Sequence, residues 1–388
     1  MTELNYQKVI SFIQSLLEGD GSYRFSPHVK EANSLSTCFA LLTNEILNHK
    51  PEGLERSLSY LRSFQVEESG LFVDNSILKN LKGTHDTDYI SHQVTYHILM
   101  VLDAFGSKPK YQLKFLNAYK DETVLTDWLE RLNWSNPWLV SNNVMFVLNF
   151  FIYQDENENR KYIDTILDWL DTNQSSLNGM WNMGKKSTLH NQMAGAFHFQ
   201  YFYDYLKRPK KKIDLIVDKT LLIQEYDGLF SYASGGGSCD DLDGVDLLCR
   251  NYHEVNDSRK ARVSRALLKA RSALFANQNT DGGFCWAKRT QFKLGNVFHL
   301  LPIRLLLAGE YLDAKRSFVM KIKNIIATLF LKNRLKWQFS GIEKCKIMID
   351  QSDVFSTWFR VLSIVMIDKV TKNELLNVRN NIGIGYLK

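Results

Sequence analysis

The fold of this chain is decided by the stretch Gln224-Glu225-Tyr226-Asp227-Gly228-Leu229-Phe230 and by its copy, Gln278-Asn279-Thr280-Asp281-Gly282-Gly283-Phe284. Each is a glutamine, a spacer, a glycine, one further residue and an aromatic ring; we call the Gly-x-aromatic part the marker. Copies with one extra spacer residue run from Gln65 to Phe72 and from Gln174 to Trp181. Degraded copies stand at Gly21-Ser22-Tyr23 and Trp337-Gln338-Phe339, and Trp134-Ser135-Asn136-Pro137-Trp138 occupies the place of a missing one. A period of about fifty residues is typical of repeat architectures.

Two kinds of segment alternate around the markers. Segments with apolar residues at helical spacing and one charged side, typical of helices with a solvent-exposed face, lie at about 5–18, 53–65, 110–132, 159–172, 213–224, 257–277 and 314–332. Segments that are apolar nearly all round, typical of buried helices, lie at about 34–48, 89–104, 141–154, 190–206, 241–253, 294–309 and 353–367. The alternation predicts an all-α toroid of six to seven helix hairpins, with an inner ring of buried helices inside an outer ring. We expect a single domain over residues 1–388, with the marker aromatic rings buried between hairpins.

The composition is that of an ordinary globular protein, with 45% hydrophobic and 23% charged residues. The net charge of +6 is not gathered into basic-aromatic clusters, so we expect no nucleic-acid partner. Five unevenly spaced cysteines are typical of reduced thiols, which predicts a cytoplasmic protein. We expect no signal peptide and no transmembrane segment, because the most apolar run, Val140 to Tyr153, is short and contains three asparagines. Peripheral membrane contact stays open.

The direction of the hairpins predicts where a functional site lies. Because the marker always leads from an outer to an inner segment, all inner helices should start at the same end of the barrel. Free N–H groups and partial positive charge at that end favour anions and carboxylates. We therefore expect a pocket in this mouth, with Asp88, His190, Asp243, Asn296 and Asp353 around one cavity.

The densest polar cluster at the expected mouth is Asp240, Asp241, Asp243 and Asp246, which follows a run of three glycines. One Asp is enough to cap a helix, and crowded carboxylates repel one another and raise at least one pKa. A raised pKa suits a general acid, and the cluster also suits a metal ion. The candidate catalytic residues are these four Asp together with two imidazole bases, His190 and His92.

Other polar and aromatic residues stand near the same helix starts. Helix capping is the alternative role for the Asp, Ser and Thr residues there. The candidate substrate-binding residues are Asp88, Asn191, Trp181, Tyr232, Trp286, Lys293, Asn296, Asp353, Trp358 and Arg360.

The repeats resemble those of terpenoid cyclases and protein prenyltransferases, which have α/α toroid domains of alternating inner and outer helices. In class II terpenoid cyclases, an Asp-x-Asp-Asp motif opens an inner helix, and its central Asp protonates an alkene or an epoxide. Asp241-Leu242-Asp243 is similar to its first three positions, whereas Gly244 stands where the last Asp is expected. The resemblance implies that Asp243 is the general acid in a cyclisation or rearrangement of an isoprenoid, with Asp240 or Asp246 supplying the missing partner.

The prenyltransferase branch of the resemblance implies a different chemistry. Those enzymes hold zinc through an Asp, a Cys before an inner helix and a His on the next one. Cys239, Asp240 or Asp241, and His299 resemble this set, although the Asp-x-Cys spacing is absent. We expect no metal or other cofactor, with zinc or magnesium as the alternative.

Two further functions stay open for a small-molecule or glycan substrate. Other α/α toroids are carbohydrate-active lyases, epimerases or uronide hydrolases, and His190, Asn191, Tyr232 and Arg360 would fill such roles. The other alternative is a non-catalytic toroid that binds a partner in its mouth. A deep aromatic cavity would favour a prenyl chain, and a shallow cleft lined by His, Asp and Arg would favour a glycan.

Overall fold

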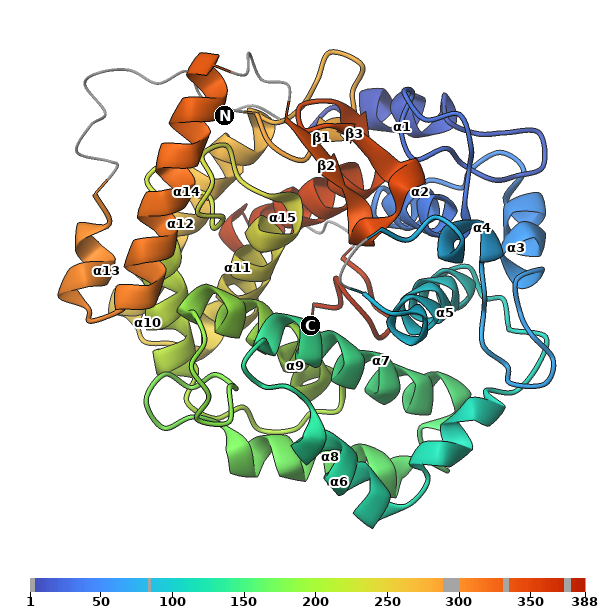
Figure 1. Cartoon of the computed structure of the whole chain (residues 1–388), viewed down its shortest axis with the longest axis horizontal. Coiled ribbons are helices and arrows are strands. Elements are labelled where there is room, and N and C mark those ends of the chain that lie inside the picture. Colours follow the sequence, from blue (N-terminus) through green and yellow to red (C-terminus); the bar gives the residue numbers. More distant parts are fainter. Residues whose placement is uncertain (1–3, 83–84, 289–300, 331–334, 373–377, 388) are drawn as a thin grey trace.

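The chain forms two concentric rings of helices in a computed structural model that describes residues 4–82, 85–288, 301–330, 335–372 and 378–387 (Figure 1). The inner ring consists of α2 (Ser34–Ile46), α5 (Thr87–Ala104), α7 (Pro137–Asp155), α9 (Leu189–Tyr205), α11 (Ser238–Asn251) and α15 (Val354–Lys372). Consecutive inner helices pack against each other, and α15 packs against both α11 and α2, which closes the ring. The predicted all-α toroid is confirmed, with six hairpins among the described residues.

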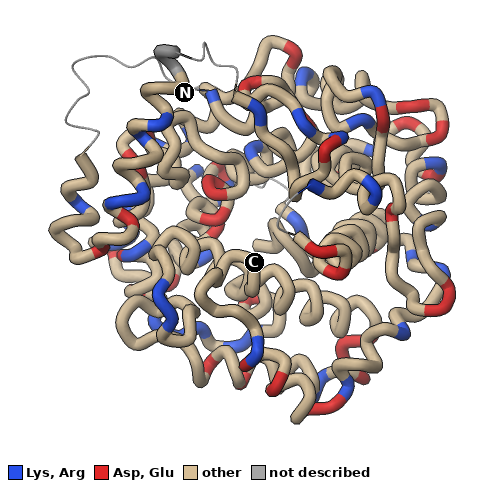
Figure 2. Tube along the Cα trace, in the orientation of Figure 1, with Lys and Arg blue, Asp and Glu red and all other residues tan. Residues whose placement is uncertain are grey.

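The outer ring carries most of the charge. It consists of α1 (Tyr6–Gln14), α3 (Leu54–Arg62), η1 (Lys114–Tyr119) with α6 (Glu122–Arg131), α8 (Arg160–Asn173), α10 (Ile213–Ile223) and α12 (Asp257–Phe275). Short turns α4 (Asn75–Leu78) and η2 (Tyr252–Glu254) link some of these. Figure 2 shows most Lys, Arg, Asp and Glu on the outer helices, whereas the inner helices other than α11 carry few charges. No helix of the described residues combines the length and the hydropathy needed to cross a membrane.

The glutamine that precedes each marker braces the turn between an outer and an inner helix. Its side-chain amide donates a hydrogen bond to the carbonyl of the marker glycine, at 3.0 Å between Gln65 and Gly70 and at 2.8 Å between Gln224 and Gly228. The same amide of Gln224 reaches Ala266 of the next outer helix at 2.9 Å. The motif is therefore a structural device that ties each hairpin to its neighbour.

The marker glycine is required because the turn lies directly on the next outer helix. Gly228 and Gly282 have φ values of +97° and +94°, a region that side-chain-bearing residues rarely adopt. A Cβ on Gly282 would lie 2.2 Å from the carbonyl oxygen of Lys8 on α1. This contact joins the last hairpin to the first and closes the outer ring.

The marker aromatic ring is buried, as predicted. Phe72, Phe230 and Phe284 have no exposed side-chain surface, and Trp181 is 2% exposed. The backbone N–H of Phe284 donates to Thr357 Oγ1 on α15 at 2.9 Å, which fixes the start of that inner helix. The degraded copy at Gly21 to Tyr23 makes the same kind of contact with α2. By contrast, Trp337 and Gln338 lie in a strand and Phe339 begins the 3-10 turn after it, so this copy is not a marker.

The structure corrects the prediction of a seventh inner helix at 294–309. Its described part is only the short helix α13 (Ile303–Leu307), with the long α14 (Tyr311–Phe330) after it, and residues 289–300 lie outside the described part. The marker after α12 leads instead to α15, because β1 (Phe284–Cys285) pairs with β4 (Ser352–Asp353). Residues 286–351 are thus an insertion within the sixth hairpin, and their apolar pattern does not mark a ring position.

The two ends of the barrel are covered differently. At the end where the inner helices start lies the mouth hairpin, which we define as residues 335–351 with β2 (Lys336–Gln338), η4 (Phe339–Gly341), η5 (Glu343–Cys345) and β3 (Lys346–Met348). At the other end the segment 378–387 enters the barrel, where the Ile384 N–H donates to the Tyr96 hydroxyl at 3.0 Å. The barrel is therefore a chamber with a floor and a partly covered mouth.

A glycine substitution tests the ring-closing contact. We expect Gly282→Ala to destabilise the protein by the cost of a left-handed backbone, about 1–3 kcal/mol, plus about 1–3 kcal/mol for the overlap with Lys8. The matched control is Gly184→Ala, which has a φ of +67° but no atom within 4 Å of the added Cβ. Urea unfolding of both variants measures the difference. Equal losses would show that the contact between the first and last hairpins does not hold the ring.

Candidate active site

A cavity of about 360 Å³ opens in the mouth of the barrel. Side chains from the first halves of α5, α7, α11 and α15 line it, together with α9 and the mouth hairpin. Ile384 of the C-terminal segment closes its floor. Ligand pockets typically have volumes of about 300–1,000 Å³, so the cavity is large enough for a small molecule.

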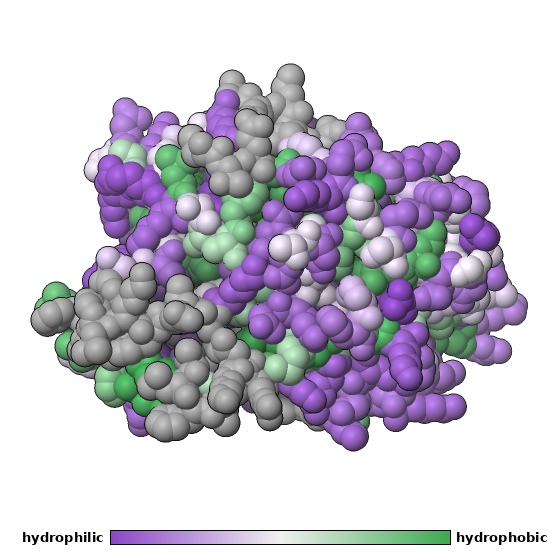
Figure 3. Space-filling model, turned by 90° about the horizontal axis from the view of Figure 1, so that it is seen from above, coloured by the Kyte–Doolittle hydropathy of each residue, from purple (hydrophilic) through white to green (hydrophobic). Residues whose placement is uncertain are grey.

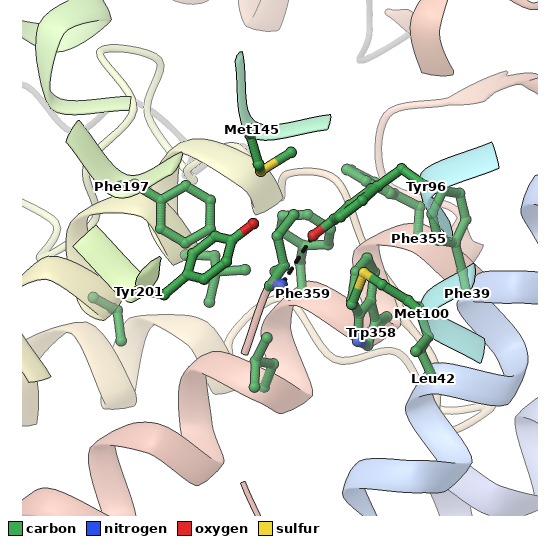
Figure 4. Close-up of a cluster of buried hydrophobic side chains, with 14 of the residues drawn as sticks. Phe39, Leu42, Tyr96, Met100, Met145, Phe197, Tyr201, Phe355, Trp358 and Phe359 are labelled. Atoms are coloured by element: carbon green, nitrogen blue, oxygen red, sulfur yellow. Dashed lines mark hydrogen bonds between the residues drawn. The ribbon is translucent and has the colours of Figure 1, made fainter. Parts of the chain in front are cut away.

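Aromatic rings make up most of the cavity wall. Figure 4 shows Met145, Phe197, Phe355 and Phe359 converging from α7, α9 and α15. Phe355 lies 4.3 Å from Phe359, measured between ring centroids. The aromatic side chains that line the cavity are Tyr89, Trp138, Phe197, Trp286, Trp337, Phe339, Phe355 and Phe359. The described lining therefore matches the aromatic cavity that the sequence linked to a prenyl chain.

Asp243 is the carboxyl that this cavity contains. It lies on the second turn of α11 and is 2% exposed, and no Lys, Arg or other carboxyl lines the cavity among the described residues. Burial raises its pKa well above the usual value, and the charges of Asp240, Asp246 and Asp241 raise it further. Its Oδ2 atom has no hydrogen-bond partner. Burial therefore favours the protonated form of this carboxyl, and no described residue forms a hydrogen bond with its Oδ2 atom.

The glycine that follows Asp243 has a packing role. A Cβ on Gly244 would lie 2.3 Å from the ring of Phe230, the marker aromatic of the same hairpin. The departure from the Asp-x-Asp-Asp pattern at Gly244 is therefore explained by the close approach of the marker, since an Asp side chain does not fit.

Asp241 was predicted as a catalytic candidate, and the structure corrects this prediction. It is fully buried, and it accepts hydrogen bonds from the N–H groups of Phe230 at 2.9 Å and Gly237 at 3.2 Å. Arg360 of α15 pairs with it at 3.2 Å. Burial raises the pKa of Asp241 to about 7, against the lowering effect of Arg360. These contacts give Asp241 and Arg360 a structural role, which fixes the start of α11 against α15.

The structure also corrects the prediction that Asp246 is a catalytic candidate. It is fully buried one turn further along α11 and forms two hydrogen bonds with Arg250, at 2.8 Å and 2.6 Å. Arg250 also pairs with Asp204 at 2.8 Å and bonds to the carbonyl of Tyr386 in the C-terminal segment. Asp246 therefore anchors the floor of the barrel and does not face the cavity.

Asp240 and His190 lie together beside the cavity, not in its lining. His190 Nε2 is 3.8 Å from Asp240 Oδ1, and neither ring nitrogen of the buried His190 forms a hydrogen bond. The His190 ring packs 4.8 Å from the ring of Tyr232, whose hydroxyl donates to Asp313 of α14. Asp313 also accepts from the N–H groups of Leu189 and His190 and so caps α9 from outside the ring.

On α5 the two predicted residues, Asp88 and His92, do not line the cavity. Asp88 is exposed, and His92 packs 5.5 Å from the Phe115 ring and 5.6 Å from the Phe150 ring, outside the cavity. Tyr89, Gln93 and His97 line the cavity instead. They are spaced four residues apart, so they share one helix face, and this spacing was the signal that the sequence offered.

The remaining predicted binding residues divide between the cavity and the core. Trp286 lines the cavity and stacks on Trp337 at 4.5 Å, and Asp353 caps α15 through the Ser356 N–H at 2.7 Å. Burial raises the pKa of Asp353 to about 7. The residues with packing or surface roles away from the cavity are Trp181 against Phe199, Trp358 against Phe39, and Asn191 with Arg316. Lys293, Asn296 and His299 lie outside the described residues.

Of the five residues expected around one cavity, Asp243 lines it, Asp88, His190 and Asp353 do not, and Asn296 lies outside the described residues. Several lining residues were not predicted, among them two buried histidines. Burial lowers the pKa of His97 to about 4 and that of His198 to about 3, so both are neutral at physiological pH. Within the described ranges, no three His, Cys, Asp or Glu side chains come together in an arrangement that could hold a metal ion.

No protein-family model matches the chain, and no curated protein sequence matches it at a significant level. Solved structures do resemble it. One is a variant of the type II terpene cyclase MstE from Scytonema in complex with geranylgeranyl dihydroxybenzoate, at 14% identity and a TM-score of 0.50. The match covers 94% of this chain and 97% of the cyclase chain.

Two further solved structures are more distant in fold. One is ent-copalyl diphosphate synthase from Streptomyces platensis, at 17% identity and a TM-score of 0.41, with coverage of 74% of this chain and 50% of that one. The other is a polysaccharide lyase, at 12% identity and a TM-score of 0.46, with coverage of 96% and 99%. At 14% identity the likeness to MstE is one of fold, so the chain is an all-α toroid similar in fold to a type II terpene cyclase.

Proposed function

We propose that this protein is a terpene-cyclase-like enzyme in which Asp243 protonates a carbon–carbon double bond or an epoxide of an isoprenoid substrate. The observation that carries the proposal is the position of Asp243 as the one carboxyl among the described residues of an aromatic-lined cavity. Cyclisation or rearrangement of the resulting carbocation would follow inside the same cavity.

The environment of Asp243 supports its role as an acid. An alkene is a weak base, so the proton donor has to be a carboxylic acid and not a carboxylate. Burial and the neighbouring carboxylates raise the pKa of Asp243 well above its usual value and so favour the protonated form. Ion pairs with Arg360 and Arg250 engage Asp241 and Asp246, which leaves Asp243 as the buried carboxyl of α11 without an ion pair among the described residues.

The lining supports the carbocation chemistry that follows. The faces of aromatic rings carry partial negative charge and attract cations, most strongly where water is excluded. Trp286 and Trp337, stacked at 4.5 Å, and the pair Phe355 and Phe359 present such faces. Aromatic faces of this kind favour a migrating positive charge.

A base is needed to take up a proton when the last carbocation collapses to an alkene. His97 is our candidate, because it lines the cavity and burial lowers its pKa to about 4, which keeps it neutral. Its Nδ1 lies 2.7 Å from the carbonyl oxygen of Gln93, which can only accept. The ring proton is therefore on Nδ1, and Nε2 keeps a lone pair. A weak base is sufficient, since a carbocation is a strong acid.

A carbohydrate-active enzyme is the second candidate, favoured by His190. This buried imidazole has no hydrogen-bond partner and lies against Tyr232, an arrangement that suits proton removal from a sugar. Against it, Arg360 is fully buried in an ion pair with Asp241, so it is not free to bind a uronate carboxylate. The raised pKa of Asp243 suits a general acid, whereas a non-catalytic binding toroid has no use for it.

Replacing the acid with its amide tests the proposal. We expect Asp243→Asn to keep the fold, because the amide has the size of the neutral carboxyl and is likewise uncharged, and to lower turnover by about 10²–10⁴-fold. Product formation is measured with a geranylgeranyl-bearing substrate and, in parallel, with an unsaturated uronide. The control is Asp88→Asn, an exposed carboxyl at the start of α5. Full activity of Asp243→Asn, or turnover of the uronide alone, would overturn the assignment.

The pH dependence of stability tests the protonation of Asp243 without any substrate. An unfolded Asp has a pKa of about 3.9, whereas burial holds the folded pKa of Asp243 well above that value. Stability from this group is therefore fully present below pH 4 or so and is lost as the pH rises toward the folded pKa. We expect the unfolding free energy of the wild type to fall, relative to Asp243→Asn, by about 1.4 kcal/mol per pH unit. Urea unfolding across this range measures it, and a pH-independent difference would contradict a buried acid.

A further inference from the structure

Apolar side chains are concentrated on one part of the surface, formed by α13, α14 and the residues just before them. Nine of the fourteen large hydrophobic residues exposed in the described chain lie between residues 301 and 326, so this is one patch and not a scatter. Leu307 is 84% exposed and Tyr311 is 70% exposed. Hydrophobic residues reach the surface at the left of Figure 3, the side on which Figure 1 shows α13 and α14. We call this surface the α13–α14 face.

The outer side of α14 is apolar along its length. Tyr311, Phe318 and Ile326 are exposed and recur at helical spacing, whereas Asp313, Ser317 and Asn324 are buried against the barrel. These three polar residues of α14 therefore face the protein, and many of its apolar residues face outward. An exposed apolar area of this extent marks an interaction site and not a solvated surface.

The charges on the α13–α14 face have one sign. The exposed charged residues between 301 and 327 are Arg304, Lys315, Arg316 and Lys323. The two acidic residues of the stretch are turned inward, since Glu310 pairs with Lys219 of α10 and Asp313 caps α9. Apolar side chains flanked by Lys and Arg are typical of helices that lie in the interface of an anionic bilayer. A protein partner would have to supply both an apolar and an acidic surface.

The face also lies beside the mouth of the barrel. Asp313 binds the first turn of α9 and the hydroxyl of Tyr232, and Arg316 bonds to Asn191 at 3.3 Å. The start of α9 is thus held to α14. A bilayer against this face would lie next to the mouth, where a long hydrocarbon substrate would leave the lipid.

We propose that the α13–α14 face docks the protein on the surface of an anionic phospholipid membrane, with α13 and α14 lying along the interface and not crossing it. The docking itself stands on exposure and charge, and only its purpose, delivery of an isoprenoid to the cavity, rests on the proposed function.

Co-sedimentation with vesicles tests the docking. The probes are vesicles of phosphatidylcholine with phosphatidylserine in equal parts, and vesicles of phosphatidylcholine alone. We expect the wild type to bind the anionic vesicles, and Leu307→Glu to weaken this binding by roughly tenfold, because a carboxylate is placed in the apolar contact. The matched control is Leu177→Glu: Leu177 is also 84% exposed but lies far along the chain in the loop after α8, and its substitution should leave binding unchanged. Thermal melting confirms that both variants are folded.

Three outcomes would overturn the proposal: no binding of the wild type to either vesicle, equal losses for Leu307→Glu and Leu177→Glu, or a wild-type dimer in sedimentation velocity that Leu307→Glu dissociates. The last result would make the face a contact between two copies of the chain. Asp243→Asn should bind vesicles as the wild type does. The docking and the cyclase chemistry can therefore fail independently.

Discussion

Closing six hairpins into a ring requires each connection between an outer and an inner helix to lie flat against the next outer helix. A glycine without a Cβ makes this approach possible, and the Gln side chain before it holds the turn in place. At Gly282 the neighbour is Lys8 of α1, so the same local contact that builds each step also joins the last hairpin to the first. The barrel, its common mouth and its cavity depend on this repeated contact.

The three buried carboxyls of α11 have different surroundings in the closed ring. Asp241 and Asp246 each meet an arginine, from α15 and from the next turn of α11, and the pairs tie the helix to its neighbours at both ends of the barrel. Asp243 lies between them and faces the cavity, where no cation among the described residues balances it. Leaving one carboxyl unpaired in a low-dielectric site stabilises its neutral form. The carboxyls that hold the helix in place and the carboxyl proposed as the acid thus lie on adjacent turns of α11.

The insertion at 286–351 turns a plain toroid into one with a covered mouth and an apolar outer face. Its mouth hairpin brings Trp337 and Phe339 to the cavity wall, while α14 caps α9 through Asp313. Because the insertion interrupts the sixth hairpin between the marker and α15, it adds these features without opening the ring. The chemistry of the cavity and the surface beside it therefore come from one segment that is not part of the repeat.

The sequence by itself determined the toroid, the alternation of outer and inner helices as far as α12 and the common end of the inner helices, because period, hydrophobic pattern and turn glycines are local properties. It also singled out Asp243, whose burial among like charges follows from the crowding of Asp residues on one helix start. The pairing of Asp241 was decided by tertiary structure, since Arg360 is more than a hundred residues away along the chain, whereas Asp246 and Arg250 lie one helical turn apart. The same holds for α5, where the phase of the helix places His97 and not His92 in the cavity. Only the folded chain shows that the apolar residues of α13 lie on the surface, because a hydrophobic pattern records which residues avoid water and not what they contact instead.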